Sequence, residues 1–378
     1  MTRGWRTLVV ALPLLLVAGC TTIESRLSGT TTTEEIAQRT ADFYAHDVGD
    51  ECCSVAIVSS SGTVFANAGS VDEHSLYRIA SLTKVFLHPI LLKLHREGRL
   101  NLDRPVTDYS RLDLPPEYGA VTLRELLENR SGLPREFLVP FGPVSTFRAL
   151  TCGLWGTHIY SGFDSREDFA EEAWNPCWRL AVRRKREVYS NVGFGLLGTS
   201  VEDALGKSLE EILHEELVVP LKLDDTAFEP ELSLCSNRMT RACAGQLPWL
   251  TRRGRSVPDH RLGNALRASG GIISSATDCA KMFSTYWVIL DEQLRQRSID
   301  AFEDDAVFGL LRVKKLSSGR RVLYRAGMIY GGASFVGFDP QARAIVVILR
   351  NVTSWPDDCG FAVMERLSTV REDERGWQ

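Results

Sequence analysis

Strand-like runs lie at both ends of this 378-residue chain, and their separation constrains the fold more than any other feature. Near the N-terminus, two apolar or alternating runs flank a Ser-Gly turn, which predicts a β-hairpin over residues 54–59 and 63–68. Near the C-terminus, turn sequences such as Ser-Ser-Gly and Asp-Pro separate similar runs at residues 307–313, 321–325, 333–338 and 344–351. We therefore predict one antiparallel sheet built from both chain ends, from residues 50–75 and 305–352.

Helical patterns fill the interval between these two groups of strands. The spacing of apolar residues predicts helices at residues 82–97, 122–128, 192–205, 208–217 and 275–289. A further helix is predicted at residues 33–45, with Thr33 as its N-cap and Glu34 and Glu35 near its positive end. The fold class that follows is mixed α/β (α+β): an antiparallel sheet flanked by helices, with a helical region of about residues 85–300 inserted between its strands.

The composition is that of an ordinary globular protein, with 44% hydrophobic and 24% charged residues. A formal net charge of −4 and a pI near 6.0 argue against a nucleic-acid partner, because binding to phosphates needs a surplus of clustered Lys and Arg. The basic run at residues 183–186 is the exception. Two interpretations of it remain open: a solvated loop face, or a contact with an anionic partner or substrate.

The first twenty residues have the pattern of an export signal. Arg3 and Arg6 precede an apolar run at residues 8–17, which is too short to span a bilayer. The sequence Val-Ala-Gly-Cys follows, and it resembles the end of a bacterial lipoprotein signal peptide. Cleavage there would leave Cys20 as the lipid-modified first residue of the mature chain. An ordinary secretory signal with a chance cysteine is the alternative.

The domain organisation that we predict has three parts. A lipoprotein signal peptide at residues 1–19 precedes a Thr/Ser-rich tether at residues 20–33 and one folded domain at residues 34–372. The protein is then exported and lipid-anchored in the cell envelope. Thr21, rather than an aspartate, follows the anchored cysteine, and by resemblance this favours the periplasmic face of the outer membrane if the host is Gram-negative.

Eight cysteines remain once Cys20 is set aside, and an even number in an exported protein suggests disulfides. The pairs Cys152–Cys177 and Cys235–Cys243 are preferred because each brackets a loop-like segment, although the sequence does not choose among the pairings. The chain has no Cys-x-x-Cys or His-Glu-x-x-His motif, so we expect no metal site and no cofactor.

A serine and a lysine stand three residues apart at the head of the predicted helix 82–97. In the sequence Ala-Ser-Leu-Thr-Lys, Ser81 and Lys84 fall on one helix face about one turn apart. A serine needs a partner to take its proton, and a lysine in apolar surroundings deprotonates more readily than in water. Unpaired N–H groups at a helix start can also hold an oxyanion. The alternative is a helix cap at Ser81 and a surface lysine.

Further motifs follow in a fixed order along the chain. Tyr189 and Asn191 form the single Tyr-x-Asn sequence, directly before another predicted helix, and the block Arg-Ala-Ser-Gly-Gly begins at Arg267. Together with the Ser-x-x-Lys motif, these blocks resemble the serine β-lactamase and D,D-peptidase superfamily, in particular its class C β-lactamase-like carboxypeptidase/esterase branch. The resemblance extends over residues 54–352 and implies a catalytic cleft between the sheet and the helical region.

The resemblance also implies a role for each motif residue. Ser81 would be the acylated nucleophile and Lys84 its proton partner. Tyr189 would act as general base in acylation and as acid toward the leaving group, provided that nearby cations lower its pKa from about 10. Asn191 would hydrogen-bond the lysine and the amide or acyl chain of the substrate. A buried tyrosine hydroxyl that caps the next helix is the alternative for Tyr189.

The third family motif departs from its usual form. A Lys-Thr-Gly or His-x-Gly strand is expected by resemblance, whereas this chain has Arg325, Ala326 and Gly327. Arg325 keeps a permanent positive charge beside the tyrosine, and Gly327 leaves room for the substrate backbone. Ala326 lacks the hydroxyl that, in Lys-Thr-Gly members, helps to bind a substrate carboxylate, which predicts weaker recognition of penicillin or D-Ala-D-Ala without loss of the Ser-Lys-Tyr chemistry. The N–H of Met328 would complete the oxyanion hole.

Two more departures lie near the cleft. The Pro-Gly turn that often precedes the tyrosine is replaced by Asn-Pro-Cys at residues 175–177 and the basic run, so this edge is predicted to be remodelled. Pro89 lies inside the predicted helix 82–97, where it should cause a kink beyond the catalytic turn.

Two functions remain open from the sequence. The first is an envelope serine hydrolase that acts through an acyl-serine intermediate on an amide or ester of a small molecule or peptide, in the manner of a D,D-peptidase or esterase and with at most weak β-lactamase activity. The second is a catalytically inactive binding protein that keeps the cleft. The sequence predicts no oligomeric state.

Overall fold

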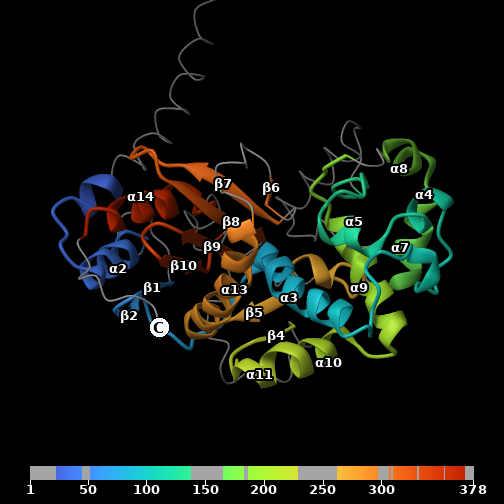
Figure 1. Cartoon of the computed structure of the whole chain (residues 1–378), viewed down its shortest axis with the longest axis horizontal. Coiled ribbons are helices and arrows are strands. Elements are labelled where there is room, and N and C mark those ends of the chain that lie inside the picture. Colours follow the sequence, from blue (N-terminus) through green and yellow to red (C-terminus); the bar gives the residue numbers. More distant parts are fainter. Residues whose placement is uncertain are drawn as a thin grey trace, which may run out of the picture.

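The computed structural model contains a seven-stranded antiparallel sheet, which lies to the left in the view of Figure 1, with the inserted helical region to its right. Strands from the two ends of the chain pair directly, since Val55 of β1 lies opposite Ile348 of β10. The strand order is β2-β1-β10-β9-β8-β7-β6. The strands are β1 (Cys53–Ser59), β2 (Gly62–Ala68), β6 (Ala306–Val307), β7 (Leu311–Lys315), β8 (Arg321–Ile329), β9 (Gly332–Asp339) and β10 (Ala344–Arg350). The predicted fold class, with one sheet built from both chain ends, is therefore confirmed.

The structure describes residues 23–44, 52–137, 165–182, 186–228, 262–296, 306–307, 310–329, 332–352 and 354–370. Several predictions fall outside these ranges. They concern Cys20, residues 183–185 of the basic run, and the cysteines Cys152, Cys235 and Cys243. The side chain of Cys177 also lies outside the described part. The described cysteines Cys52, Cys53, Cys279 and Cys359 form no disulfide with one another.

Two strand predictions differ from the structure at the edge of the sheet that β6, β7 and β8 form. The run 307–313 is divided into β6 and β7, rather than one strand. Conversely, β8 extends four residues beyond the predicted end at Arg325, because it stays paired with β9 as far as Ile329. Its pairing with β7, in contrast, is recorded only as far as Tyr324. The motif from Arg325 to Met328 thus lies in a regular strand whose β7 side has no described strand partner.

Helices cover both faces of the sheet (Figure 1). On one face, α2 (Thr33–Asp42) and α14 (Asp357–Leu367) bury an apolar cluster against β1, β9 and β10. On the other face, α13 (Ala276–Gln296) contacts β1 and β10, with α3 (Thr83–Arg96) beside it. Every residue of β1, β9 and β10 is consequently buried, which explains why these strands are continuous apolar runs in the sequence.

The segment before α2 packs against the domain, unlike the tether predicted over residues 20–33. Residues 23–27 form a helical turn, and its Ile23 and Leu27 are buried in the cluster beneath α2 and α14. Arg366 of α14 donates to the hydroxyl oxygen of Thr30 over 2.8 Å. The N-cap of α2 is Thr32 rather than Thr33, since the Thr32 side chain accepts from the backbone N–H of Glu35. The segment packs because Ile23 and Leu27 are apolar side chains that can be buried, whereas a wholly polar tether has none.

The inserted helical region agrees with the predicted pattern in most of its elements. The predicted helices 122–128 and 192–205 correspond to α5 and α9, and Thr122 forms a capping box with Glu125. The predicted helix 208–217 divides into α10 and the π-helix η4. The short and longer helices of this region are η3 (Val106–Asp108), α4 (Pro116–Gly119), α5 (Leu123–Leu127), α7 (Arg166–Ala173), α8 (Pro176–Ala181), α9 (Asn191–Leu205), α10 (Leu209–Leu213), η4 (His214–Val218) and α11 (Val219–Leu221).

A small second sheet that the sequence did not predict fixes the approach to the nucleophile. It has the order β3-β5-β4, with β3 (Tyr77–Arg78), β5 (Ile272–Ser274) and β4 (Ala227–Phe228). Directly after β3, the N–H of Ile79 donates to the carbonyl of Ile272 over 3.2 Å. The small sheet therefore holds the segment that leads into Ser81.

The helix that carries Lys84 is α3, and it continues through Pro89 to Arg96. Its apolar residues are buried against the sheet and the inserted region, including Val85, Phe86 and Leu94. Among the described helices, none has both the length and the apolar character that crossing a membrane requires.

Close packing between α14 and β9 generates a stability prediction at Gly360. A Cβ atom at Gly360 would lie 2.6 Å from the Phe335 ring, which is fully buried and stacked against Tyr324. We expect Gly360→Ala to lower the free energy of unfolding by about 1–3 kcal/mol through overpacking, although alanine favours the helix. Urea denaturation measures the change. An unchanged or higher midpoint would contradict the packing described here.

Candidate active site

Ser81 lies on a strained turn between β3 and α3. It occupies the 3-10 helix η2 (Ala80–Leu82), which precedes α3, whereas the sequence predicted one helix over residues 82–97 with Ser81 at its head. Ala80 has φ +47°, a left-handed conformation that costs a non-glycine residue about 1–3 kcal/mol. The hydroxyl of Ser334 on β9 donates to the carbonyl of Ile79 over 2.7 Å and helps to hold this turn. The turn leaves Ser81 half-buried at the surface of the core.

Tyr189 meets Ser81 from the inserted helical region. The two hydroxyl oxygens are 2.6 Å apart, within hydrogen-bonding distance, although 108 residues separate them in the chain. Tyr189 directly precedes the N-cap of α9, Ser190, which accepts from the N–H of Gly193 and donates to the carbonyl of Pro134. These bonds fix the backbone next to the phenol. The phenol therefore lies in position to take the Ser81 proton.

Lys84 lies one turn after Ser81 and is fully buried. Its Nζ donates to Oδ1 of Asn191 over 2.7 Å and to the carbonyl of Ser269. The same atom lies 4.8 Å from the centroid of the Tyr189 ring. Burial lowers the pKa of Lys84, and the charge of Arg325 lowers it further, while Tyr189 opposes this change. The site thus brings the predicted Lys84 and Asn191 together with the nucleophile.

The phenol of Tyr189 has a pKa of about 8, below its ordinary value of 10. Burial by itself would raise this pKa, but the nearby cations Lys84 and Arg325 outweigh that effect and stabilise the phenolate. The guanidinium carbon of Arg325 lies 4.5 Å from the ring centroid. Arg325 is also buried, and one of its terminal nitrogens donates to the carbonyl of Leu310 over 3.1 Å. A tyrosine in this environment can act as a base near neutral pH.

Strand β8 lies directly against the nucleophile turn at Gly327. A Cβ atom there would lie 2.7 Å from the backbone nitrogen of Ser81 and 2.8 Å from the carbonyl oxygen of Ile79. The sequence suggested that Gly327 leaves room for substrate, but the protein's own backbone fills that space. Met328 follows in the same strand, opposite Ala333 of β9. The N–H of Ser81 and this stretch of β8 therefore lie side by side, as an oxyanion hole requires.

Ala326 lies on a different face of β8 from Gly327. Its methyl group packs against the apolar cluster beneath α2 and α14, near Tyr324 and Phe361. Consequently, this position adds no hydroxyl to the cleft, in line with the loss inferred from the sequence.

Four residues that the sequence did not single out also contribute to the site. Ser334 supports the nucleophile turn and Ser269 accepts from Lys84, whereas Arg135 and Glu136 lie near Tyr189 and Asn191 respectively. Ser269 lies in the Arg-Ala-Ser-Gly-Gly block that carries the family resemblance, which was a signal for its position without a role. Ser334 had no such signal, because its contact depends on how β9 meets the turn.

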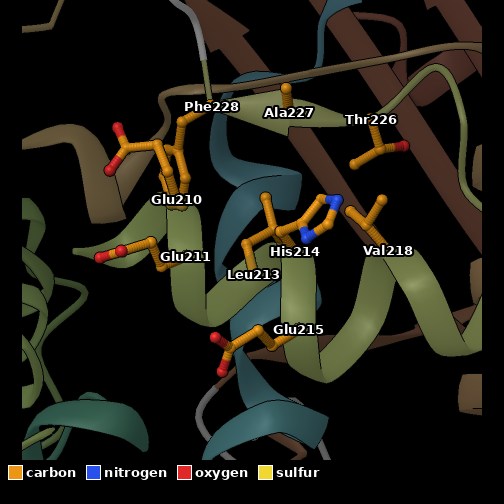
Figure 2. Close-up of a pocket in the computed structure, with 9 residues that line it drawn as sticks. All are labelled: Glu210, Glu211, Leu213, His214, Glu215, Val218, Thr226, Ala227 and Phe228. Carbon is orange, nitrogen blue, oxygen red and sulfur yellow. The ribbon is translucent and has the colours of Figure 1, made fainter. Parts of the chain in front are cut away.

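A cavity of about 420 Å³ lies away from these groups, between α10, η4 and β4 (Figure 2). Its carboxylates point to the side opposite the imidazole of His214 (Figure 2). Each one is engaged: Glu210 pairs with Arg267, Glu211 caps α10 through Ser208, and Glu215 pairs with Lys207. The acidic lining therefore serves the helices around it, and the catalytic groups lie elsewhere.

The arrangement can carry out acyl transfer in two stages. The Tyr189 phenolate takes the Ser81 proton while Oγ forms a bond to the carbonyl carbon, and the carbonyl electron pair moves onto oxygen. The oxyanion faces the Ser81 N–H and β8. When the tetrahedral intermediate collapses, the leaving group receives the proton from Tyr189. Water then attacks the acyl-serine by the same route, and the acid product and Ser81 are released.

An antiparallel sheet with an inserted helical region, and a Ser-Lys-Tyr cluster between them, defines an acyl-serine hydrolase. The profile of the Beta-lactamase family matches residues 45–366. The chain therefore belongs to the Beta-lactamase family, whose members with this fold are serine hydrolases.

Curated relatives share part of this chain. D-alanyl-D-alanine-carboxypeptidase/endopeptidase AmpH of Escherichia coli K12 is 26% identical over 281 residues, which cover 71% of this chain and 64% of the relative. Protein flp of Staphylococcus aureus is 27% identical over 189 residues, which cover 47% of this chain and 34% of the relative. The match thus spans less than two thirds of the length of either relative.

Solved structures share the fold at lower identity. The octameric penicillin-binding protein homologue from Pyrococcus abyssi superimposes with a TM-score of 0.67 at 22% identity, covering 86% of this chain and 75% of that one. D-amino acid amidase from Ochrobactrum anthropi SV3, complexed with L-phenylalanine amide, gives 0.66 at 20% identity and covers 88% and 97%. These likenesses establish the penicillin-binding protein/β-lactamase fold for the chain.

The charge of Arg325 generates a prediction about pH dependence. The active form of Tyr189 is the phenolate, so kcat/KM should rise as the pH increases through about 8 and level off above it. Arg325→Gln removes one cation, and we expect the Tyr189 pKa to return toward 10 and the rising limb to move to higher pH. The measurement is the pH profile of p-nitrophenyl acetate hydrolysis.

Arg325→Lys is the matched control, because it keeps the positive charge. Its rising limb should stay near that of the unaltered protein. Superimposable profiles for Arg325→Gln and the unaltered protein would contradict the electrostatic explanation of the lowered pKa.

Proposed function

We propose that this protein is an envelope hydrolase that cleaves an amide or ester through an acyl-Ser81 intermediate, with D,D-peptidase or amidase-like substrates ahead of penicillins. The observation that carries this proposal is the 2.6 Å contact between the Ser81 and Tyr189 hydroxyls, with Tyr189 held at a pKa of about 8. Both the nucleophile and its base are therefore arranged before any substrate binds.

The preference for amides and esters over penicillins is supported by the third motif. Ala326 has no hydroxyl, so the donor that Lys-Thr-Gly members offer to a substrate carboxylate is missing by resemblance. A hydrogen bond to a charged group contributes about 1.5–3 kcal/mol, or roughly 10- to 150-fold in affinity. The carboxypeptidase/endopeptidase name of the E. coli relative is consistent with a D-amino-acid substrate class.

The envelope location is supported by the sequence before the folded domain. The apolar run at residues 8–17 and the following Val-Ala-Gly-Cys resemble a lipoprotein signal, with Cys20 as the modified residue. A hydrolase held there by its N-terminus would reach amide and ester bonds in the cell envelope.

Active-site labelling tests the proposed chemistry. We expect a fluorescent fluorophosphonate to label Ser81 rapidly and a fluorescent penicillin to label it slowly or weakly, with mass spectrometry locating each adduct. Ser81→Ala should abolish both reactions, and Tyr189→Phe should slow labelling about 10²- to 10⁴-fold because the base is lost while the ring remains. Failure of both probes to label the protein would instead favour the catalytically inactive binding protein.

Lipid attachment tests the proposed location. When the full chain is expressed in a bacterial host with labelled palmitate, we expect incorporation of the label and partition into the detergent phase. Cys20→Ala should lose the label and move the protein to the aqueous phase, because no thiol remains for acylation. Equal labelling of both proteins would refute anchoring at Cys20.

A further inference from the structure

The helical turn at residues 23–27 belongs to the folded domain, although the surrounding sequence has the composition of a tether. Ile23 and Leu27 are buried in the apolar cluster between the sheet and the helices α2 and α14. The three exposed residues between them are Glu24, Ser25 and Arg26. The turn therefore has an inner side that packs against the domain and an outer side, formed by these three residues, that is open to the surroundings.

Hydrogen bonds from two helices hold the turn and the residues after it in place. Arg39 of α2 donates to the carbonyl of Arg26 over 2.9 Å and to that of Ser28 over 3.0 Å. From α14, the side chain of Arg366 donates to the hydroxyl oxygen of Thr30 over 2.8 Å. Because its backbone is bound to both helices, this segment does not serve as a flexible connection to the residues before it.

The stretch that separates the turn from Cys20 is short. Only Thr21 and Thr22 stand between Cys20 and Ile23. An extended chain spans at most about 3.3–3.6 Å per residue, so these three steps reach roughly 10 Å. A flexible tether over residues 20–33 would instead reach roughly 45 Å. The packing of the turn thus shortens the distance that the domain can move from Cys20 about fourfold.

Such a short connection limits how the domain can be oriented on a membrane. A lipid-modified cysteine has its acyl chains in the bilayer, so its backbone lies at the level of the headgroups. A further reach of about 10 Å is close to one Debye length at physiological salt. The domain cannot then rotate freely above the bilayer, because the turn must stay near Cys20. The connection therefore selects which face of the domain meets lipid.

The nucleophile lies on the other side of the sheet from this face. The turn packs into the cluster beneath α2 and α14, whereas Ile79 and Leu82, on either side of Ser81 in the chain, belong to the cluster that includes α3 and α13. The sheet separates the two clusters. Lipid against the outer side of the turn is consequently separated from Ser81 by the sheet.

We infer that the outer side of the turn, formed by Glu24, Ser25 and Arg26, is a membrane-facing surface that the short connection to Cys20 holds against the phospholipid bilayer. This inference rests on the proposed lipid modification of Cys20. The surface carries one acidic and one basic side chain, so attraction to anionic lipid contributes little and the connection maintains the contact. Ser81 then acts on amide or ester bonds in the layer next to the membrane.

Fluorescence quenching on vesicles tests this inference with the full, lipid-modified chain. The vesicles contain phosphatidylcholine, phosphatidylglycerol and a lipid with a nitroxide on its headgroup, and the protein carries genetically encoded acridonylalanine in place of Ser25. We expect the nitroxide to remove most of this fluorescence. The loss should persist in about 1 M salt, where the Debye length is only about 3 Å, because the contact does not depend on charge.

The matched control carries acridonylalanine in place of Val219, an exposed residue of α11. This helix lies at the lower edge of Figure 1, away from α2 and α14. The control should keep most of its fluorescence, because α11 lies far from the turn that is connected to Cys20.

A linker variant tests whether the short connection causes the contact. About twenty Gly and Ser residues inserted between Thr22 and Ile23 keep Cys20 and the folded domain, and add a mean reach of roughly 25 Å. The fluorescence at Ser25 should then recover to the level of the control. The inference is overturned if the two positions are quenched equally, if neither is quenched, if salt releases the quenching, or if the linker leaves it unchanged.

Labelled palmitate on the same samples separates this result from the proposed anchor. Absence of lipid at Cys20 would refute both the anchor and the membrane-facing surface, whereas normal lipid modification with equal quenching at the two positions would refute the surface alone. Fluorophosphonate labelling of Ser81 on the vesicles reports on the hydrolase independently.

Discussion

The fully buried ammonium of Lys84 is the interaction on which the rest of the site depends. A charge in such a place is costly unless polar groups surround it. Here two oxygens accept from it, Asn191 Oδ1 and the carbonyl of Ser269, and the electron-rich face of Tyr189 lies nearby. These partners come from two segments far from Lys84 in the chain, residues 189–191 and Ser269, so the need to surround one lysine with protein groups brings the catalytic elements together.

The same arrangement explains why the chemistry resides in a tyrosine. Arg325 and Lys84 both lower the pKa of Tyr189, while burial opposes them, and the net result is a phenol that ionises near pH 8. An arginine side chain carries a permanent charge, unlike a lysine in a buried site. The permanent charge on β8 therefore adds to that of Lys84 in stabilising the phenolate.

The sequence predicted the parts of this protein that depend on local spacing, and it missed those that depend on tertiary contact. The three-residue separation of Ser81 and Lys84 places them on one helix face in any α-helix, and the paired apolar runs at the two chain ends predicted the sheet. Three features arise only when β8, β9 and α9 meet. They are the left-handed conformation of Ala80, the close approach of the Gly327 backbone to the Ser81 turn, and the hydrogen bond between Asn191 and Glu136. Apolar residues at Ile23 and Leu27 were outweighed by the polar composition around them, so their burial was missed.

The contact between β8 and the Ser81 turn has a consequence for the stage of synthesis at which the protein becomes active. Synthesis proceeds from the N-terminus, so the Ser81 turn emerges about 240 residues before β8, which begins at Arg321 and lies against the turn through Gly327. A chain synthesised only as far as the inserted helical region has Ser81 but neither the arginine on β8 nor the strand beside the oxyanion. Hydrolytic competence therefore coincides with completion of the polypeptide, and nascent or truncated copies are chemically silent.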